Sequence, residues 1–248
     1  MKNTVENNFR IWDQKYDWPR DGDEWDGQSR LSHQPYDEWK KSIIETFIAP
    51  NISENSIALE IAPGHGRWTT GIVEFCKEII LIDLSPSCIE FCKKRFASFN
   101  HVRYIVNDGK SLNGVKDNYV DFVWSYDSFV HMDKNTIEAY LNEISRVLKS
   151  EGVGIIHHAG RRHALLWLDF LRRKGKIGNR FYNLISMGKK GDGDDGWRSN
   201  ISKRLFKELA VDKGLGVEAQ MQRWGKNHEF GIPRYGDFIT ILRKNQSR

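Results

Sequence analysis

The sequence predicts an α/β fold: a doubly wound, mostly parallel sheet of seven strands in which the last strand is antiparallel. Three observations support this fold class. Between residues 56 and 159, short apolar runs rich in β-branched residues alternate with segments of helical periodicity. The chain of 248 residues is long enough to bury a substantial core. Its composition, 39% hydrophobic and 29% charged, is typical of a globular protein and not of a disordered chain.

Seven segments have the length and composition of strands. Five of them lie in the alternating region, and two follow it near the end of the sequence. We expect these last two to close the sheet as a β-hairpin. The strands are predicted at residues 57–61, 79–84, 102–106, 120–125, 153–157, 217–224 and 238–243.

The segments between these strands predict helices. Residues 68–76, 87–96 and 136–148 have apolar positions at steps of three and four, which gives each helix one buried stripe. Pro86 suits the first turn of the second helix, and Ser85 before it is a plausible N-cap. A further helix is predicted at 201–213.

Two regions depart from the alternating pattern. Residues 1–50 interleave tryptophan with acidic residues and are predicted to form a separate N-terminal segment. The remainder, 51–248, is predicted to be one domain with an insertion at about 161–200. This insertion joins a basic, apolar helical stretch at 161–176 to a flexible, glycine-rich loop at 188–196.

Several classes of protein are disfavoured by composition. Residues 1–9 are polar, and no apolar run approaches the roughly 18 residues that span a bilayer, so we expect a cytoplasmic protein with no membrane partner. The three cysteines form an odd set without a metal-binding spacing, which predicts reduced thiols. Residues 192–196 lack the acid pattern of a calcium loop, so no metal is predicted.

The first predicted strand ends in a carboxylate and is followed by a glycine-rich turn, Glu60 to Gly66. Such a turn brings backbone N–H groups close to a ligand, and a side chain at Gly64 or Gly66 would collide with it. A dinucleotide site needs the pattern G-x-G-x-x-G, but Thr69 stands in the place of the third glycine. The dinucleotide interpretation therefore fails.

This turn resembles motif I of the class I S-adenosylmethionine-dependent methyltransferases, acidic-x-G-x-G-x-G, with Ala62 in the place of the first glycine. The resemblance covers about residues 56–160 and implies a Rossmann-like fold, with S-adenosyl-L-methionine as cofactor. In that family an acid after the second strand binds the ribose diol, and Asp83 matches it. Asp108 matches the acid that binds the adenine amine.

The resemblance also implies that the N-terminal segment, 1–50, folds over the strand ends as a lid, and that the loop after the fourth strand borders the methyl-transfer cavity. Ser125 and Tyr126 begin that loop. The predicted cofactor contacts are Glu60, Ala62, Pro63, Gly64, Gly66, Asp83, Leu84, Asp108, Gly109, Ser125 and Tyr126.

Methyl transfer from a sulfonium is an in-line displacement, so the protein contributes alignment and the removal of an acceptor proton. His131, Asp127 and His157 are the candidate catalytic residues by predicted position. Successive strand residues face opposite sides, so only one of His157 and His158 can easily point into the site. The predicted acceptor contacts are Trp12, Tyr16, Trp18, Trp25, His158 and Arg161.

The leading hypothesis is methylation of an oxygen or nitrogen of a small biosynthetic metabolite, heteroaromatic or sugar-like. A formal net charge of +5 and a pI near 9.0 keep RNA methylation as an alternative. The sequence lacks the Asn/Asp-Pro-Pro-aromatic tetrad often used to stack a flipped base, which disfavours nucleic acid as partner. A non-catalytic nucleotide-binding or partner-binding module is the third alternative. The sequence leaves open whether the protein is a monomer or a homodimer.

Overall fold

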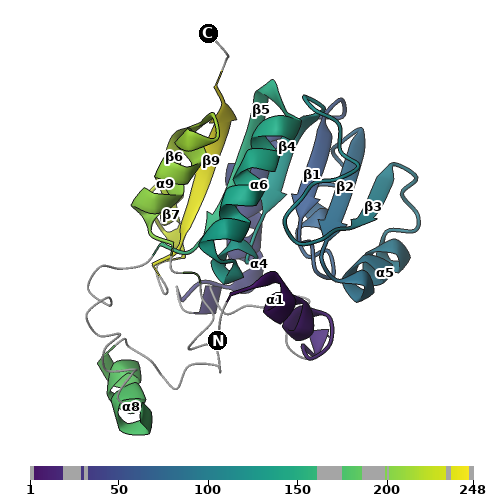
Figure 1. The fold of residues 1–248 in the computed structure, drawn as a ribbon. Coiled ribbons are helices and arrows are strands. Elements are labelled where there is room, and N and C mark those ends of the chain that lie inside the picture. Colours follow the sequence, from purple (N-terminus) through teal and green to yellow (C-terminus); the bar gives the residue numbers. More distant parts are fainter. Residues whose placement is uncertain are drawn as a thin grey trace.

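The computed structural model describes residues 3–18, 29–30, 33–160, 175–185, 199, 201–232 and 236–245. Its centre is a seven-stranded sheet with the order β3-β2-β1-β4-β5-β9-β6 (Figure 1). The first five strands are parallel, and β9 is antiparallel to both of its neighbours. The strands are β1 (Ile57–Ile61), β2 (Glu78–Asp83), β3 (Val102–Val106), β4 (Val120–Ser125), β5 (Leu148–His158), β6 (Leu215–Met221) and β9 (Phe238–Lys244). The predicted fold class is confirmed.

Helices cover both faces of this sheet. In Figure 1, α6 and α9 lie in front of it and α4 lies behind it, while α1 lies along the lower edge, where the parallel strands end. A two-stranded ribbon, β7 (Arg223–Trp224) and β8 (Phe230–Gly231), follows β6. The helices are α1 (Val5–Trp12), α4 (Tyr36–Ile43), α5 (Pro86–Arg95), α6 (Lys134–Val147), α8 (Gly175–Ile185) and α9 (Lys203–Asp212).

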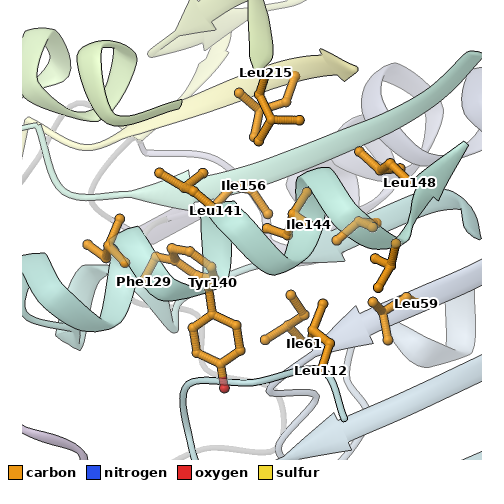
Figure 2. Close-up of a cluster of buried hydrophobic side chains, with 14 of the residues drawn as sticks. Leu59, Ile61, Leu112, Phe129, Tyr140, Leu141, Ile144, Leu148, Ile156 and Leu215 are labelled. Carbon is orange, nitrogen blue, oxygen red and sulfur yellow. The ribbon is translucent and has the colours of Figure 1, made fainter. Parts of the chain in front are cut away.

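Two apolar clusters result from the alternation of side chains along the strands. Leu59 and Ile61 point to the α6 side and pack with Leu141 and Ile144 (Figure 2). Ala58, which precedes Leu59 in β1, points to the other side and joins the cluster around Trp39 of α4. Burial of each such large side chain stabilises the fold by about 1.5–3 kcal/mol. A parallel sheet buried on both faces requires largely buried strands, and β1, β2 and β4 are buried at all but one position each.

The start of α5 follows the sequence prediction. Ser85 Oγ accepts a hydrogen bond from the backbone N–H of Cys88 at 3.1 Å, and Pro86 occupies the first helical position. Cys88 and Cys92 are both buried on one face of this helix. The three cysteines are free thiols, as predicted.

The predicted helix at 68–76 is wrong. The structure has only a 3-10 turn at Thr69–Gly71, with turns around it. The Thr69 hydroxyl donates to Glu60 Oε2 at 2.6 Å, and Gly71 lies so close to Ile44 that a Cβ there would be 2.9 Å from Ile44 Cδ1. Tertiary contacts therefore override the apolar periodicity of this segment.

The C-terminal strands also differ in detail from the prediction. The predicted strand 217–224 divides into β6 and β7, because the chain turns at Gln222 to pair with β8 and not with β9. The expected antiparallel pairing of the last two long strands is present between β6 and β9. Of the predicted insertion at 161–200, the structure describes mainly α8. Residues 161–174 of the helix expected at 161–176 lie outside the described residues. No helix among the described residues is long and apolar enough to cross a membrane.

Candidate active site

The carboxyl ends of β1, β2, β3 and β4 lie side by side. Ile61 pairs with Ile82, Asp83 pairs with Val106, and Glu60 pairs with Trp124. The segments that follow these strands therefore meet at one edge of the sheet, around the point where the chain order reverses between β1 and β4. Ligands of open α/β sheets bind at such a point.

The turn after β1 is a tight series of left-handed residues. Ala62 and Gly64 both have a φ of 58°, and Gly66 has a φ of 81°. A Cβ at Gly66 would stand 2.4 Å from the Phe96 ring, so only glycine fits there. Ala62, in the place of the expected glycine, adopts the same left-handed backbone conformation, which costs a non-glycine residue about 1–2 kcal/mol.

Asp83 at the end of β2 fixes this turn. Its Oδ2 accepts a hydrogen bond from the Gly64 N–H at 3.1 Å, and its Oδ1 accepts from the Ser85 N–H at 2.8 Å. Burial raises the pKa of Asp83 to about 6, although these backbone donors oppose the shift. The carboxylate keeps further lone pairs that can accept hydrogen bonds from a diol.

Glu60 is also buried, at the end of β1. Burial raises its pKa to about 7, while the hydrogen bond from Thr69 and the charge of Arg67 oppose the increase. Thr69 thus has a specific role at the position where a dinucleotide site would have glycine: its hydroxyl satisfies the buried carboxyl group.

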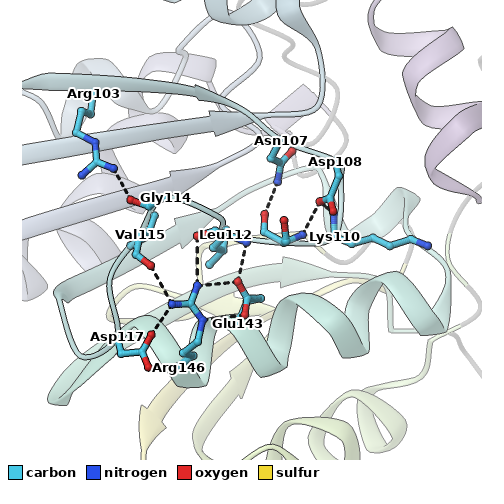
Figure 3. Close-up of polar contacts among 11 residues, drawn as sticks. Arg103, Asn107, Asp108, Lys110, Leu112, Gly114, Val115, Asp117, Glu143 and Arg146 are labelled. Carbon is cyan, nitrogen blue, oxygen red and sulfur yellow. Dashed lines mark hydrogen bonds and ion pairs between the residues drawn. The ribbon is translucent and has the colours of Figure 1, made fainter.

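The loop after β3 is held in shape by its own polar groups (Figure 3). Asp108 Oδ1 accepts from the N–H groups of Lys110 and Ser111, and Asn107 Oδ1 accepts from the Gly109 N–H at 3.1 Å. Arg146 of α6 ties the following segment down by donating to the carbonyl oxygens of Leu112 and Val115 and to three carboxylate oxygens. Asp108 itself remains exposed.

The N-terminal segment crosses all four of these strand ends. After β3, a Cβ at Gly109 would be 2.8 Å from Val5 Cγ1; after β4, Asn8 Nδ2 donates to the His131 carbonyl at 2.8 Å. After β2, Asp13 Oδ1 accepts from the hydroxyls of Ser85 at 2.7 Å and Ser87 at 2.9 Å. We call residues 3–18 the N-terminal strap.

The strap ends in an aromatic cluster over the turn after β1. Trp18 stacks on His65, with ring centroids 4.7 Å apart, and its Nε1–H donates to the Trp12 carbonyl at 2.9 Å. Tyr16 packs against both tryptophans, and Trp12 also lies 5.1 Å from the ring of His131. Three of the predicted acceptor contacts are thus brought together. Two further predicted acceptor contacts, Trp25 and Arg161, lie outside the described residues.

A buried network of charged groups lies beyond β4 and β5. Asp127, with a φ of 60°, accepts a hydrogen bond from Arg67 Nη2 at 2.6 Å. Its Oδ1 lies 3.2 Å from His157 Nδ1, and the other ring nitrogen of His157 lies 3.4 Å from Asp237 Oδ2. Tyr126 covers the imidazole, with ring centroids 4.3 Å apart.

Ser125 and His131, also predicted from the sequence, lie at the two ends of the loop after β4. Ser125 Oγ donates to the Ile61 carbonyl at 2.8 Å, which joins β4 to β1. His131 lies next to Trp12 of the strap and is 8% exposed. Their assigned roles stay predictions.

His158 points away from this network, as the alternation along a strand requires. Its ring stacks on Phe206 of α9 with centroids 3.6 Å apart, and its Nε2 lies 2.6 Å from Thr240 Oγ1. Burial lowers the pKa of His158 to about 3. A role in acceptor binding stays a prediction, and this enclosed position gives it no support.

Sequence reasoning missed Asp13, Arg67 and Asp237 as members of the site. Arg67 directly follows the glycine turn and could have been considered from its place in the sequence. Asp13 and Asp237 lie far along the chain from their partners, so no local pattern indicates them. Among the described residues, no group of three or more His, Cys, Asp or Glu could hold a metal ion.

Comparison with known proteins agrees with this geometry. Residues 59–156 match the protein family described as Methyltransferase domain, from β1 to β5. YqeM, a candidate methyltransferase of Bacillus subtilis (strain 168), is 27% identical over 124 residues, 50% of this chain and 48% of the relative. Phosphoethanolamine N-methyltransferase 1 of Caenorhabditis elegans is 27% identical over 156 residues, 62% of this chain and 31% of the relative. The matched segments thus span less than half of either relative.

A solved structure extends the similarity to most of the chain. The S-adenosylmethionine-dependent methyltransferase from Clostridium acetobutylicum ATCC 824 has the same fold, with a TM-score of 0.62 at 15% identity. The alignment covers 89% of this chain and 96% of that one. Together with the matched family model from β1 to β5 and the strand order, this confirms the predicted resemblance to the class I S-adenosylmethionine-dependent methyltransferases.

Proposed function

We propose that this protein transfers the methyl group of S-adenosyl-L-methionine to an oxygen or nitrogen atom of a small metabolite. The observation that carries the proposal is the contact between Gly64 and Asp83. It joins a glycine turn with a left-handed backbone to a buried carboxylate at the neighbouring strand end. This arrangement suits a ligand that combines a ribose diol with a chain lying against the turn.

The donor would be held by the residues at this edge. Asp83 would accept hydrogen bonds from the two ribose hydroxyls, and Asp108 with the Gly109 backbone would bind the adenine ring. Leu84 lies close to Gly109, within 3.2 Å of the position of an added Cβ, and would form part of the wall beside the ring. When bound, the donor supplies an electrophilic methyl group, so the protein has to align an acceptor and exclude water.

The aromatic cluster of the N-terminal strap supports a small and planar acceptor. Trp12, Tyr16 and Trp18 lie together beside His131 and above the turn after β1. Aromatic rings offer flat apolar surfaces at low entropic cost, with polar edges that hydrogen-bond to a substrate. His131 would then act as the base or contact nearest to the strap, because its ring lies 5.1 Å from Trp12.

Calorimetry with S-adenosylhomocysteine tests the donor site. Wild-type protein is expected to bind it, and Asp83→Ala is expected to weaken binding by about 1.5–3 kcal/mol, the value of hydrogen bonds to a charged group. Asp212→Ala, which removes an exposed carboxylate on α9, serves as the matched control. No binding by the wild-type protein would overturn the proposal.

Incubation with methyl-labelled donor tests the acceptor class. The panel should contain phenols, sugars, heteroaromatic amines and phosphoethanolamine, the last because one relative is named for its methylation. Transfer to at least one small molecule supports the proposal. Label found only in RNA or protein would contradict it.

A further inference from the structure

We propose that Asp237 is a positioning residue of the acceptor site, which acts through His157 to hold the carboxylate of Asp127 toward the acceptor. The proposal rests on the proposed function and deepens it. It also gives the two catalytic candidates Asp127 and His157 different tasks. Asp127 would contact the acceptor, and His157 would support it.

The geometry forms a line of contacts through the ends of three strands. Asp237, just before β9, is fully buried and lies 3.4 Å from His157 Nε2 at the end of β5. The opposite ring nitrogen, Nδ1, lies 3.2 Å from Asp127 Oδ1 after β4. The backbone at Asp237 is fixed as well, because its carbonyl accepts a hydrogen bond from Gln222 Nε2 at 2.9 Å.

Only one end of this line reaches the surface. The side chains of His157 and Asp237 are 0% exposed, whereas that of Asp127 is 22% exposed. Asp127 also has a left-handed backbone, a strain of about 1–3 kcal/mol that persists where surrounding contacts enforce it. Its carboxylate is therefore held in one orientation by the Arg67 guanidinium and the His157 ring.

Two patterns of protons are compatible with the distances. In a neutral ring, Nδ1 accepts from the Asp127 backbone N–H, which lies 3.1 Å away. In a charged ring, Nδ1–H donates to the Asp127 carboxylate. In the neutral ring, the Nδ1 lone pair would lie 3.2 Å from the negatively charged Asp127 Oδ1, which is repulsive. In the charged ring, the carboxylates of Asp127 and Asp237, one beside each nitrogen, stabilise the imidazolium. The two carboxylates therefore favour the charged ring, although the Asp127 backbone N–H, which would then face the Nδ1–H at 3.1 Å, opposes it.

The surrounding groups agree with this assignment. Burial disfavours a charged imidazole, but the carboxylates of Asp127 and Asp237 beside its two ring nitrogens outweigh this effect and raise the pKa of His157 above its ordinary value. Tyr126 stacks on the ring and stays neutral, because burial holds its pKa well above the ordinary value. His158 next in the chain stays neutral as well. A ring that already carries its proton does not act as the base.

Asp127 has the complementary property. Burial alone would raise its pKa, yet the hydrogen bond from His157 and the charge of Arg67 hold the pKa of Asp127 well below its usual range. A carboxylate that is ionised throughout the neutral range is a weak base. It can instead accept a hydrogen bond from an N–H or O–H group and orient that group for displacement. The site thus suits an acceptor molecule that carries an N–H or O–H group beside the atom to be methylated.

Nuclear magnetic resonance of the imidazole nitrogens tests the proposal without any acceptor. The wild-type His157 resonances, assigned by comparison with His157→Gln, are expected to report a doubly protonated ring at about pH 7.5. Asp237→Asn keeps the shape of the side chain and removes its charge, and it is expected to shift His157 toward the neutral form. A neutral His157 in the wild-type protein would overturn the proposal whatever the variant does.

Kinetics separate positioning from a merely structural role. Asp237→Asn is expected to lower kcat about tenfold or more while the affinity for S-adenosylhomocysteine changes less than about twofold. Leu141→Ala, a truncation in the cluster on the other face of the sheet, is the control for lost stability and should leave the His157 resonances unchanged. Equal loss of kcat in both variants would overturn the proposal. Failure of the wild-type protein to bind S-adenosylhomocysteine would instead count against the proposed function, since the resonance experiment is independent of the donor.

Discussion

The indole of Trp18 lies directly against Gly64. A Cβ built on Gly64 would stand 2.6 Å from Trp18 Cη2 and 2.8 Å from Cζ3. The absence of a side chain at Gly64 thus lets the N-terminal strap close over the turn after β1. Under the proposed function the donor would approach this same surface of the turn, so the strap and the donor would meet at Gly64.

Gly64→Ala is expected to lower the free energy of unfolding for two reasons. The left-handed backbone costs an alanine about 1–2 kcal/mol, and the contact with Trp18 adds roughly 1–3 kcal/mol of overpacking. Gly214→Ala measures the backbone cost alone. Gly214 also has a left-handed backbone, with a φ of 78°, but the nearest atom would lie 3.7 Å from the new Cβ, so no overpacking is added. Urea unfolding measures both changes.

The part of the destabilisation that comes from overpacking against Trp18 should disappear when Trp18 is replaced by alanine. In the double variant Trp18→Ala/Gly64→Ala, the added cost of the alanine is expected to fall to that of Gly214→Ala. If the cost of Gly64→Ala is the same with and without Trp18, the contact between the two residues has no energetic role.

Asp13 anchors the strap to the start of α5, and its removal should loosen the segment. Asp13→Ala deletes the acceptor of the Ser85 and Ser87 hydroxyls, and it is expected to accelerate proteolytic cleavage within residues 3–18 several-fold. Glu6→Ala, an exposed acid on the same segment, is the control. Equal cleavage rates of the two variants would contradict the anchoring role.

The same anchor should depend on pH. Burial opposes ionisation, but the hydrogen bonds from Ser85 and Ser87 outweigh it and lower the pKa of Asp13. Because the pKa is lower in the folded state, this stabilisation is fully present above the unfolded value of about 3.9 and is lost as the pH falls through the folded value. The strap is therefore expected to loosen in acid, and Asp13→Ala should remove that part of the dependence.

Donor affinity should fall in mild acid. Burial raises the pKa of Asp83 to about 6, and a carboxylate accepts two ribose hydroxyls best when it is ionised. Calorimetry between about pH 7.5 and pH 5 is expected to show affinity for S-adenosylhomocysteine declining up to tenfold per unit below this pKa. Glu60 also titrates near this range, with a pKa of about 7, so Asp83→Asn is needed to identify the group. A profile that is unchanged in Asp83→Asn would exclude Asp83 as its source.

The cysteines should be inert in the folded protein. Burial raises the pKa of Cys76 to about 11 and raises those of Cys88 and Cys92 further. Because the thiolate is the reactive form, alkylation at neutral pH is expected to be slow until urea unfolds the chain. Rapid modification of any of the three without denaturant would contradict the burial of α5 and its neighbours.

Most of the fold could be predicted because it depends on local patterns. The apolar strands, the cap at Ser85 and the crossover helices α5 and α6 are determined by residues that are neighbours in the chain. The segment at 68–76 has the same apolar spacing but forms no helix, because Thr69 turns toward Glu60 and Gly71 packs against Ile44. Such contacts come from other elements and leave no periodic signal.

By itself, the sequence determined the main strands of the sheet, the helices α5, α6 and α9, and the glycine turn that ends at Gly66, since these depend on backbone preferences and short-range hydrophobic patterning. Only the tertiary structure decided which distant groups meet at the strand ends. Asp13 binds the start of α5, Trp18 covers Gly64, and Asp237 faces His157. The physical reason is that neighbouring residues decide whether a segment forms a strand, a helix or a turn. Which side chains then contact one another depends on how these elements pack over the whole sheet.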